Sequence, residues 1–527
     1  MAFVLIGFMG AGKSTVAREL AQELGGEPLD SDALLAEQLG HPVAREFELR
    51  GEQAFREREE RLVLELLGSA RPRAVVALGG GSVLSARVRE ALAAHVTVLL
   101  DVEAAEAWRR VSRPDSSTER PLARDPERFA ALHGERRELY EELADATLIG
   151  VPSSRAVRAL PALERLAAAP RGTRMLWGGS AFASGDHAGA YPVLVGEGLL
   201  AADEEQLARI WPLERARSRA VLVSDRTVRG LYGERVGASA LSVAIEPGES
   251  HKTLASAERV WSEMARAGIT RADHVVALGG GVVGDLAGFC AASYQRGIPV
   301  VQVPTSLVAQ VDSAYGGKTG VDLPEAKNYV GAYHQPAGVL VDPLTLATLP
   351  AAELAAGWVE VLKTALVAGG GLWQTVAGGG GTDERAILAC ARTKLRVVAE
   401  DERDGGRRQV LNLGHTVGHA IETASGYGRY RHGEAVGLGL LGALRLSGQD
   451  GLRAQVRELM LARGLPVSFG EDRGAGFEDA ILQAMKRDKK RLGASVPFVL
   501  VRAPGEVEFG CEVAEADVRA AVAELAR

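Results

Sequence analysis

The pattern of apolar and polar residues changes twice along the chain. In the first part, short apolar runs alternate with stretches whose apolar residues recur every three or four positions, as in residues 13–24. Short apolar runs of this kind are typical of buried strands, and the longer periodic stretches are typical of amphipathic helices. The alternation returns further along, and helical periodicity dominates from about residue 346 onward. Examples of strand candidates lie at residues 2–7, 74–78, 96–100, 220–224, 274–278 and 300–303.

This alternation predicts α/β units in which helices cover parallel sheets. With 527 residues the chain is too long for one ordinary hydrophobic core, so more than one domain is expected. A small, Gly-rich and aperiodic segment separates the two alternating regions and is predicted to be a linker. The predicted organisation is an α/β domain over residues 1–168, a linker over 169–189, a second α/β domain over 190–345 and a helical domain over 346–527.

Composition and charge exclude several classes of protein. Hydrophobic residues make up 46% and charged residues 24% of the chain, as in ordinary globular proteins, and the formal net charge is −7. No dense block of Lys and Arg suggests a nucleic-acid or membrane partner. Cys290, Cys390 and Cys511 are too scattered for a disulfide framework or a cysteine zinc site. No apolar window approaches the ~18 residues of a membrane span, and the start lacks a basic signal-peptide segment, so a cytoplasmic location is expected.

Residues 7–14, GFMGAGKS, fit the pattern G-x4-G-K-S between an apolar strand and a helical stretch. The glycines allow the backbone to curl so that its N–H groups face phosphate oxygens, and the helix that follows adds the positive end of its dipole. Lys13 supplies charge to the terminal phosphates of ATP, and the Ser14 hydroxyl suits Mg²⁺. A glycine-rich turn without a ligand would not require the Lys-Ser pair. The predicted phosphate-binding residues are Gly10, Ala11, Gly12, Lys13, Ser14 and Thr15.

Charged residues further along suit a small polar acceptor for the phosphoryl group. Asp30 and Asp32 follow a short strand, where a carboxylate can hold Mg²⁺ or orient a hydroxyl nucleophile. Arg56 and Glu59 are three apart on one helical face, which could present a cation inward or be a solvated charged face. The LGGG segment at 78–81 allows close approach of a ligand, or is a plain turn. Further cations that could cover the transferring phosphate are Arg120 and Arg136.

The ordered set GFMGAGKST, DSD, GEQAFRERE, LGGGSV, RPL and RRELY resembles the shikimate kinase family across this first domain. The resemblance implies transfer of a phosphoryl group from ATP to the 3-hydroxyl of shikimate. It implies catalytic roles for Lys13, Asp32 and the lid residue Arg120, which also contacts ATP. Arg113 is implied on the adenine side, and Asp30 is implied to reach Mg²⁺ through water. The implied shikimate contacts are Asp32, Arg56, Gly79, Gly80, Gly81 and Arg136.

Three histidines and a glutamate in the helical region suggest a metal centre. His415 and His419 in NLGHTVGHAIE are four apart, so a helix places both on one face, and His432 follows in RHGEA. Glu360 precedes Lys363 by about one helical turn in GWVEVLKTAL. Two histidines and one carboxylate are a common catalytic zinc set. Spacing alone favours His415 and His419 as the ligand pair, but one histidine of the three could instead be structural or bind phosphate.

The second α/β region carries residues suited to a dinucleotide and to anions. LGGGVVGDLAG at 278–288 follows a strand and leads into a helix, which offers a backbone pocket for a pyrophosphate, although it is not a full G-x-G-x-x-G fingerprint. Lys318 lies in a Gly-rich segment between apolar strands, which favours a ligand over a solvated surface position. Other charged candidates, which could also be surface charges, are Glu249, Lys252, Asp285, Arg296, Lys327, Lys394, Arg408, Lys489 and Lys490.

This series resembles the 3-dehydroquinate synthase family over roughly residues 190–510. The motifs that carry the resemblance are PGExxK, GGGVxGDxxG, DSxxGGKTG, KN, ExxK, NxGHTxGHAxE, HGE and DKK. The resemblance implies Zn²⁺ or Co²⁺ on Glu360, His415 and His432, in place of the pair favoured by spacing. His419 then faces the substrate phosphate or carboxylate. The implied catalytic residues are Lys318, Lys363 and His419.

The same resemblance implies a bound NAD⁺ and a homodimer in which Arg296 reaches the neighbouring subunit's site. Ser306 departs from the family, where a second threonine usually follows PT, but a hydroxyl remains. The implied NAD contacts are Asp225, Glu249, Lys252, Gly280, Gly281, Val282, Asp285, Thr305, Ser306, Lys318 and Lys327. The implied substrate contacts are Arg296, Asp312, Lys318, Asn328, Lys363, Lys394, Arg408, Asn412, His419, Lys489 and Lys490.

Together the two resemblances imply a bifunctional enzyme of aromatic biosynthesis: a P-loop NTPase kinase domain fused to a Rossmann-like α/β domain plus an all-helical domain. The second reaction would convert 3-deoxy-D-arabino-heptulosonate 7-phosphate into 3-dehydroquinate and phosphate, with NAD⁺ regenerated in each turnover. An alternative keeps the kinase and makes the second part another sugar-phosphate cyclase or a polyol dehydrogenase. Another alternative is a non-catalytic module in one part. It is disfavoured by the presence of Lys13, Asp32, Glu360, His415 and His432.

Overall fold

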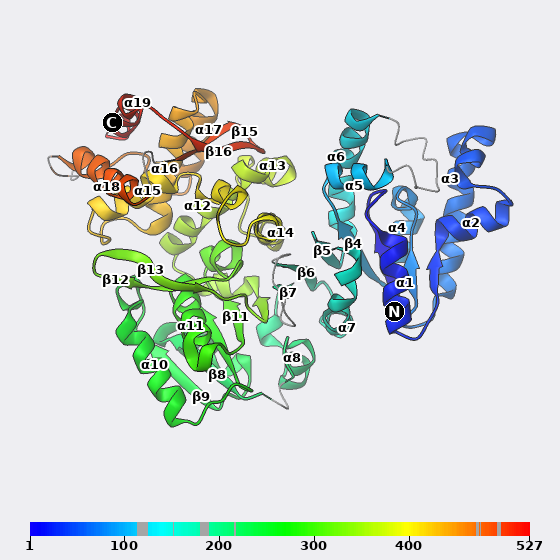
Figure 1. The fold of residues 1–527 in the computed structure, drawn as a ribbon, viewed down its shortest axis with the longest axis horizontal. Helices are drawn as coiled ribbons and strands as arrows, with labels where there is room; N and C mark the ends of the chain where they lie inside the picture. The colour runs from blue at the N-terminus through cyan, green and yellow to red at the C-terminus, as the bar shows by residue number, and fades with distance from the viewer. Residues whose placement is uncertain are drawn as a thin grey trace. The chain divides into compact units, whose positions relative to one another are not determined.

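Parallel strands with helices packed around them form the framework of both halves of the chain (Figure 1). The computed structural model describes residues 1–112, 125–150, 152–179, 189–214, 218–470, 474, 476–492 and 497–526, without the side chains of residues 47, 153, 154 and 487–492. The chain divides into two units. The first comprises Met1–Leu194 and Asp203–Pro212, and the second comprises Val195–Ala202 and Leu213–Arg527.

The first unit is built on parallel strands in the order β2-β3-β1-β4-β5-β6. Strands β1, β3, β4 and β5 are buried along their whole length, as expected for a parallel sheet with helices on its faces. The strands are β1 Phe3–Ile6, β2 Pro28–Asp30, β3 Val75–Ala77, β4 Val96–Asp101, β5 Ala146–Ile149 and β6 Arg174–Gly179, with β7 Ala190–Val195 at the end of the unit. The helices are α1 Lys13–Glu23, α2 Ser31–Leu39, α3 Val43–Ser69, α4 Ala86–Leu92, α5 Ala104–Val111, α6 Pro126–Leu143, α7 Leu160–Ala167 and α8 Glu204–Ile210.

The α/β part of the second unit contains parallel strands in the order β14-β11-β10-β8-β9. An antiparallel hairpin, β12 with β13, packs against α11 and α10. The strands are β8 Ala220–Asp225, β9 Leu241–Ile245, β10 His274–Gly279, β11 Val300–Pro304, β12 Lys318–Leu323, β13 Ala326–Tyr333 and β14 Gly338–Val341. The helices are α9 Arg226–Tyr232, α10 Leu254–Arg266 and α11 Gly281–Ser293.

The rest of the second unit is mainly helical, and α16 lies at its centre, in contact with α12, α15, α17 and α19. An antiparallel hairpin, β15 with β16, also packs on α16 and α12. The helices are α12 Ala351–Ala368, α13 Gly370–Ala377, α14 Glu384–Glu400, α15 His415–Ala424, α16 His432–Leu446, α17 Asp450–Leu461, α18 Phe477–Leu492 and α19 Glu515–Glu524. The hairpin strands are β15 Phe498–Ala503 and β16 Glu506–Cys511.

The predicted fold class is confirmed: a P-loop kinase fold precedes a Rossmann-like α/β part and a helical part. Strands also form in two segments that were expected to contain none. β6 falls inside the segment expected to be a linker, and the β15–β16 hairpin falls inside the segment expected to be helical. Among the helices of the described residues, none has both the length and the apolar character needed to cross a bilayer.

Asp273, at the turn before β10, organises the amino ends of β8 and β10 in the second unit's sheet. Its side chain is 5% exposed and accepts hydrogen bonds from the backbone N–H and the guanidinium of Arg219, and from the backbone N–H and hydroxyl of Thr270. Burial opposes ionisation of this carboxyl, but these bonds outweigh it and hold the pKa of Asp273 well below its ordinary value.

We expect Asp273→Asn to lower the free energy of unfolding of the second unit by about 1–3 kcal/mol at pH 7, because buried donors lose a charged acceptor. The folded-state pKa lies below the unfolded value of about 4, so this stabilisation is present above that pH and is lost as the pH falls. Urea unfolding of the full chain at pH 7 and at lower pH measures it. Asp479→Asn, in an exposed pair with Arg519, is the control. Equal midpoints for the two variants at pH 7 would contradict the expectation.

Candidate functional site

The loop between β1 and α1 has the geometry of a phosphate cradle. Gly12 caps α1 in the left-handed region, with φ 95°. Gly10 also has a positive φ, of 80°, and a Cβ there would lie 2.6 Å from the carbonyl oxygen of Ala107. The Lys13 ammonium donates to the carbonyl oxygens of Gly7 and Phe8, at 2.7 and 3.2 Å. The loop therefore holds its single lysine against its own backbone, at the amino end of a helix where phosphate binds favourably.

Beside this loop, the carboxyl ends of β2 and β3 bring the predicted acceptor residues together. Asp30 begins α2 by accepting from the N–H groups of Asp32 and Ala33 through Oδ1, and the next residue, Ser31, accepts from Gly79 N–H at 2.8 Å. A Cβ on Gly79 would lie 2.6 Å from Asp32 Oδ1. The turn at 79–81 therefore lies directly against Asp32, and a larger residue at position 79 would have to displace that side chain.

The predicted arginine Arg56 points into the same place from α3. Its Nη1 lies 2.6 Å from Glu59 Oε2, and Glu59, which is 4% exposed, also accepts from the Ser82 hydroxyl at 2.8 Å. A Cβ on Gly81 would lie 2.1 Å from Arg56 Nη1, so the guanidinium lies on the glycine turn. The charged helical face is therefore turned inward here, and Glu59 orients the arginine.

On α6, the buried Arg136 donates to the carbonyl oxygen of Gly80 at 3.5 Å, and the Tyr140 hydroxyl donates to the same oxygen. Arg110, at the end of α5, donates to the P-loop carbonyls of Gly10 and Ala11 at 3.4 and 3.2 Å. Arg110 was not predicted, because its place beside the loop depends on contacts with residues about 100 positions away in the sequence. The predicted residues Arg113 and Arg120 lie outside the described residues.

In the second unit, glycines allow three helices to meet. A Cβ on Gly433 of α16 would lie 1.9 Å from the carbonyl oxygen of Ala356 on α12. A Cβ on Gly439 of the same helix would lie 2.0 Å from the carbonyl oxygen of Gly414, which caps α15. Only glycine permits backbone contacts this close. The close packing brings residues from α12, α15 and α16 to one point.

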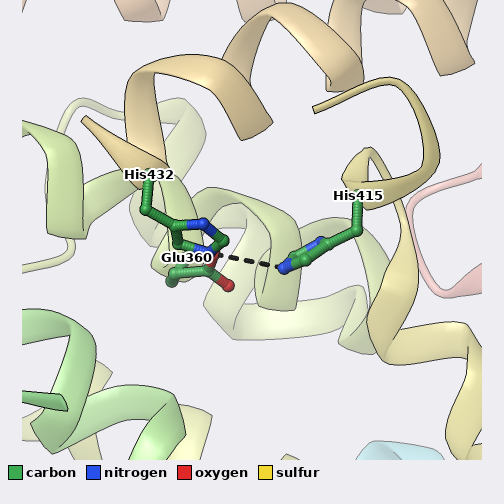
Figure 2. A group of neighbouring side chains, drawn as sticks. All are labelled: Glu360, His415 and His432. Atoms are coloured by element: carbon green, nitrogen blue, oxygen red, sulfur yellow. Dashed lines mark ion pairs between the residues drawn. The ribbon is translucent and has the colours of Figure 1, made fainter. Parts of the chain in front are cut away.

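At that point Glu360 lies between His432 and His415 (Figure 2). Glu360 Oε1 lies 3.3 Å from His432 Nε2 and 3.6 Å from His415 Nε2. Zinc bonds of about 2.0–2.1 Å in a tetrahedron separate neighbouring ligand atoms by about 3.3 Å. Neither Glu360 oxygen accepts a hydrogen bond of good geometry within the described part of the chain. A buried carboxylate at this spacing from two imidazole nitrogens fits a bound divalent metal.

The charges at this centre also suit a metal. Burial opposes ionisation of Glu360, but the neighbouring Lys363 and His415 outweigh it and lower the pKa of Glu360 to about 2. Burial lowers the pKa of His415 to about 3, although Glu360 opposes this, so the His415 ring is neutral and can donate a lone pair. For His432 burial is outweighed by contacts with Glu360 and Glu422, which raise its pKa to about 10. A metal would replace that proton.

Buried cations surround the centre. Lys363, 1% exposed, lies 2.6 Å from Glu360 Oε2 and 2.7 Å from Asp312 Oδ2. Lys394 pairs with the same aspartate. Arg408, 2% exposed, donates to the carbonyl oxygen of Gly316 at 3.0 Å. Two carboxylates therefore face three cations within this set, and the excess of positive charge favours an anionic ligand.

His419 does not share the ligand group of His415. The rings of these two histidines lie 5.2 Å apart, as their spacing on α15 requires, but His419 groups with Glu422 and His432 instead. Glu422 lies one helical turn beyond His419, and its side chain is 3% exposed. Lys327 of β13 lies 3.2 Å from Glu422 Oε1. Spacing along one helix therefore places His419 near the centre without making it part of the Glu360 group.

The predicted nucleotide residues gather at the carboxyl ends of β8, β10 and β11. Gly280 caps α11 directly after β10, so N–H groups at the start of that helix can face a pyrophosphate. A Cβ on Gly280 would lie 3.1 Å from the Ser306 hydroxyl, and a Cβ on Gly281 would lie 3.1 Å from the Ser313 hydroxyl. The glycines therefore form a close-fitting cradle, and the residues present fit a dinucleotide.

A buried lysine and several carboxylates lie next to this cradle. Lys252, 4% exposed in its side chain, lies 2.8 Å from Glu249 and 3.3 Å from Asp285, and donates to Asn328 Oδ1 at 2.8 Å. Asp322, at 3.7 Å from Lys252, belongs to this group but was not predicted. Burial raises the pKa of Asp285 to about 6 although Lys252 opposes it. Carboxylates in such a position suit ribose hydroxyls.

The remaining predicted residues differ in their surroundings. Asp225 caps α9, and the buried Thr305 follows β11 beside Gly279. Lys318 is half exposed and lies 2.5 Å from Asp404. Arg296 lies exposed in a turn with φ 69°. Val282 lies in the first turn of α11, and Asn412 ends the short 3-10 helix before α15. The side chains of Lys489 and Lys490 lie outside the described residues.

The fold and these sites define a two-part enzyme: a P-loop phosphotransferase followed by an α/β and helical unit with a nucleotide cradle and a metal-capable centre. A family model for shikimate kinase matches residues 9–164. Models for the N-terminal and C-terminal parts of 3-dehydroquinate synthase match residues 242–356 and 357–491.

Known proteins similar to the second unit agree with these matches. The 3-dehydroquinate synthase of Symbiobacterium thermophilum is 42% identical over 351 residues, which are 62% of this chain and 96% of that protein. That of Caulobacter vibrioides is 41% identical over 363 residues, 64% of this chain and 96% of that protein. A solved structure of the 2-epi-5-epi-valiolone synthase ValA from Streptomyces hygroscopicus, with NAD⁺ and Zn²⁺ bound, is 28% identical with a TM-score of 0.57. The match covers 65% of this chain and 99% of that one.

The chain therefore belongs to the 3-dehydroquinate synthase family, with a shikimate kinase domain at its N-terminal side. This is the fusion that the sequence motifs predicted. The alternative of another sugar-phosphate cyclase is not favoured, because identity is 42% to a dehydroquinate synthase and 28% to the valiolone synthase over a similar share of the chain.

Proposed function

We propose that this chain phosphorylates shikimate at its 3-hydroxyl with ATP, and converts 3-deoxy-D-arabino-heptulosonate 7-phosphate into 3-dehydroquinate and phosphate. The observation that carries the proposal is that each unit brings a group of the predicted residues together at one place. The group in the first unit comprises Lys13, Asp32, Arg56 and the turn Gly79–Gly81. The group in the second unit comprises Glu360, His415 and His432.

In the first unit, the geometry supports the proposed binding of the phosphoryl acceptor. Arg56, oriented by Glu59, and Arg136, held at Gly80, suit the carboxylate of shikimate. Asp32 lies at the glycine turn, where its carboxylate can orient the attacking hydroxyl. The Lys13 charge and the P-loop N–H groups would stabilise the transferring phosphoryl group, and Ser14 and Asp30 would hold Mg²⁺, which would supply further positive charge.

In the second unit, Glu360, His415 and His432 would hold Zn²⁺ or Co²⁺, and the Gly280–Gly281 turn would hold NAD⁺. NAD⁺ held there would supply hydride transfer at the C5 alcohol of the substrate, and the metal would supply polarisation of the oxygen of that alcohol. Lys363 lies between two carboxylates, which raise its pKa against the effect of burial, so it acts as a fixed positive charge rather than a base. That charge would stabilise negative charge that develops on the substrate in the reaction.

Further residues hold the two ends of this substrate. Lys394 and Arg408 lie in the buried cation set and suit its carboxylate, and His419 suits its phosphate. Lys318, Asn328 and Asn412 would complete the binding, with Lys318 exchanging Asp404 for the substrate. The positive excess within the buried set is the feature that suits a substrate carrying phosphate, carboxylate and developing enolate charges.

The test is to give the purified full chain each substrate separately and to identify the products by mass spectrometry. We expect shikimate 3-phosphate from shikimate and ATP. From the heptulosonate phosphate we expect 3-dehydroquinate with one phosphate per turnover and no accumulation of NADH. Stoichiometric growth of NADH absorbance would instead indicate a polyol dehydrogenase, and a different cyclic product would indicate another cyclase.

We also propose that the chain forms a homodimer through its second unit and acts in the cytoplasm. The exposed turn that carries Arg296 at φ 69° suits a residue that reaches outside its own subunit. Both reactions draw on nucleotides, and all three cysteines are free thiols. Sedimentation analysis of the full chain tests the dimer.

A further inference from the structure

The two ring nitrogens of His432 face two different carboxylates. Nε2 lies 3.3 Å from Glu360 Oε1, and Nδ1 lies 3.5 Å from Glu422 Oε1. Both glutamates are almost completely buried, with side chains 1% and 3% exposed. Glu360 belongs to the proposed metal group, but neither the reaction nor the family resemblance gives a role to Glu422.

Glu422 is itself held in place from several sides. Lys327 of β13 lies 3.2 Å from its Oε1, and the Lys327 ammonium also lies 4.8 Å from the centre of the Tyr427 ring. The Glu422 backbone oxygen accepts from the Ser425 hydroxyl at 3.0 Å and from the Tyr427 N–H at 2.9 Å. The carboxylate is therefore held by Lys327, and the backbone from which it extends is held by the turn that follows α15.

Two roles are open to such a carboxylate. Glu422 could bind a cation itself, because it forms a second metal-capable group with His419 and His432. Alternatively, it could accept a hydrogen bond from His432 Nδ1 and leave Nε2 for the metal. The position of Lys327 favours the hydrogen-bonding role over cation binding. Its positive charge lies 3.2 Å from Glu422 Oε1 and would repel a second cation at that oxygen.

We propose that Glu422 is a positioning residue that holds His432 through Nδ1, so that Nε2 faces the metal together with Glu360 and His415. Carboxylates that accept the second ring proton of a ligating histidine fix its tautomer and orientation and increase its basicity, and their loss typically lowers metal affinity by about 10–100-fold. The inference rests on the proposed function, because it requires a metal at the Glu360 group.

The test is a Co²⁺ titration of the metal-free full chain in competition with a chelator, followed by the visible absorption of bound Co²⁺. We expect Glu422→Gln to weaken Co²⁺ binding by about 10–100-fold without changing the band intensities that report coordination number. Glu422→Asp, which keeps the charge, should recover part of the affinity. Glu458→Gln, which removes an exposed carboxylate on α17, is the matched control and should bind as the unaltered chain does.

His415→Ala separates failure of this inference from failure of the proposed function. One outcome is that His415→Ala loses affinity for Co²⁺ while Glu422→Gln binds Co²⁺ within about twofold of the unaltered chain, well short of the expected loss. In that case Glu422 does not position His432, but the proposed metal site is retained. If Glu422→Gln changes the Co²⁺ band intensities, Glu422 is a direct ligand and the positioning role is overturned. If His415→Ala binds Co²⁺ like the unaltered chain, the metal centre itself is elsewhere, and the inference falls with it.

Discussion

Lys13→Ala is expected to lower kcat for shikimate phosphorylation by about 10²–10³-fold, the usual cost of losing one preorganised charge at a transition state. The Lys13 ammonium lies on the P-loop carbonyls of Gly7 and Phe8, at the amino end of α1. Negative charge on the transferring phosphoryl group develops there. Alanine leaves the loop backbone able to contact phosphate, so ATP binding should weaken less than turnover.

Steady-state kinetics of both reactions on the same preparation checks this expectation. Formation of 3-dehydroquinate should be unchanged, because Lys13 belongs to the first unit and the proposed synthase groups lie in the second. Arg61→Ala removes an exposed cation from α3 of the same unit and serves as the control for charge alone. Unchanged phosphorylation by Lys13→Ala would remove the P-loop from the kinase reaction.

The sequence contained enough to predict the framework of both units. Runs such as residues 2–7 and 274–278 are buried strands, because parallel strands covered on both faces leave a continuous apolar signal. β6 was missed because its six residues, RMLWGG, are short and end in glycine within a Gly-rich segment. The β15–β16 hairpin was missed because the surrounding helical periodicity outweighed two short strands joined at a Pro-Gly turn.

The candidate metal centre shows that the spacing of histidines along the sequence does not by itself predict which residues form one group. A helix brings His415 and His419 within 5.2 Å, so their spacing predicted a ligand pair. The histidine that shares Glu360 with His415 is His432, on another helix. Its position depends on backbone contacts at Gly433 and Gly439, which are tertiary and leave no periodic signal in the sequence. The family motifs nominated a group that the structure brings together around Glu360, which spacing did not.

Some partners of site residues also depend on the tertiary structure. Lys318 was predicted to face a ligand because of its glycines, and in the structure it pairs with Asp404, 86 positions away. Asp322 joins the Lys252 group from β12, although the alternation of that strand gives no hint of a carboxylate turned toward a lysine. Ion pairs between distant segments become visible only when the strands and helices are assembled.

The second large effect is expected at Glu360. Glu360→Ala should lower formation of 3-dehydroquinate by about 10³-fold or more, since a bound metal supplies several kcal/mol of charge stabilisation and each 1.4 kcal/mol is about tenfold in rate. Glu360 Oε1 faces both His415 and His432, so its loss removes the shared negative charge and leaves Lys363 with only one of its two carboxylate partners. Both metal affinity and turnover should therefore fall.

Alanine at a buried ionic position can also destabilise the fold, so Glu360→Gln is the second variant, with nearly the same shape and no charge. Metal content after dialysis, phosphate release and thermal unfolding are measured on both. We expect both variants to lose metal and phosphate release while phosphorylation of shikimate continues at the unaltered rate, because Lys13 and Asp32 belong to the first unit. A folded Glu360→Gln chain that retains metal and releases phosphate normally would show that Glu360 is not a ligand. Parallel loss of kinase activity would show instead that the two units depend on one another, which separate sites in one chain do not require.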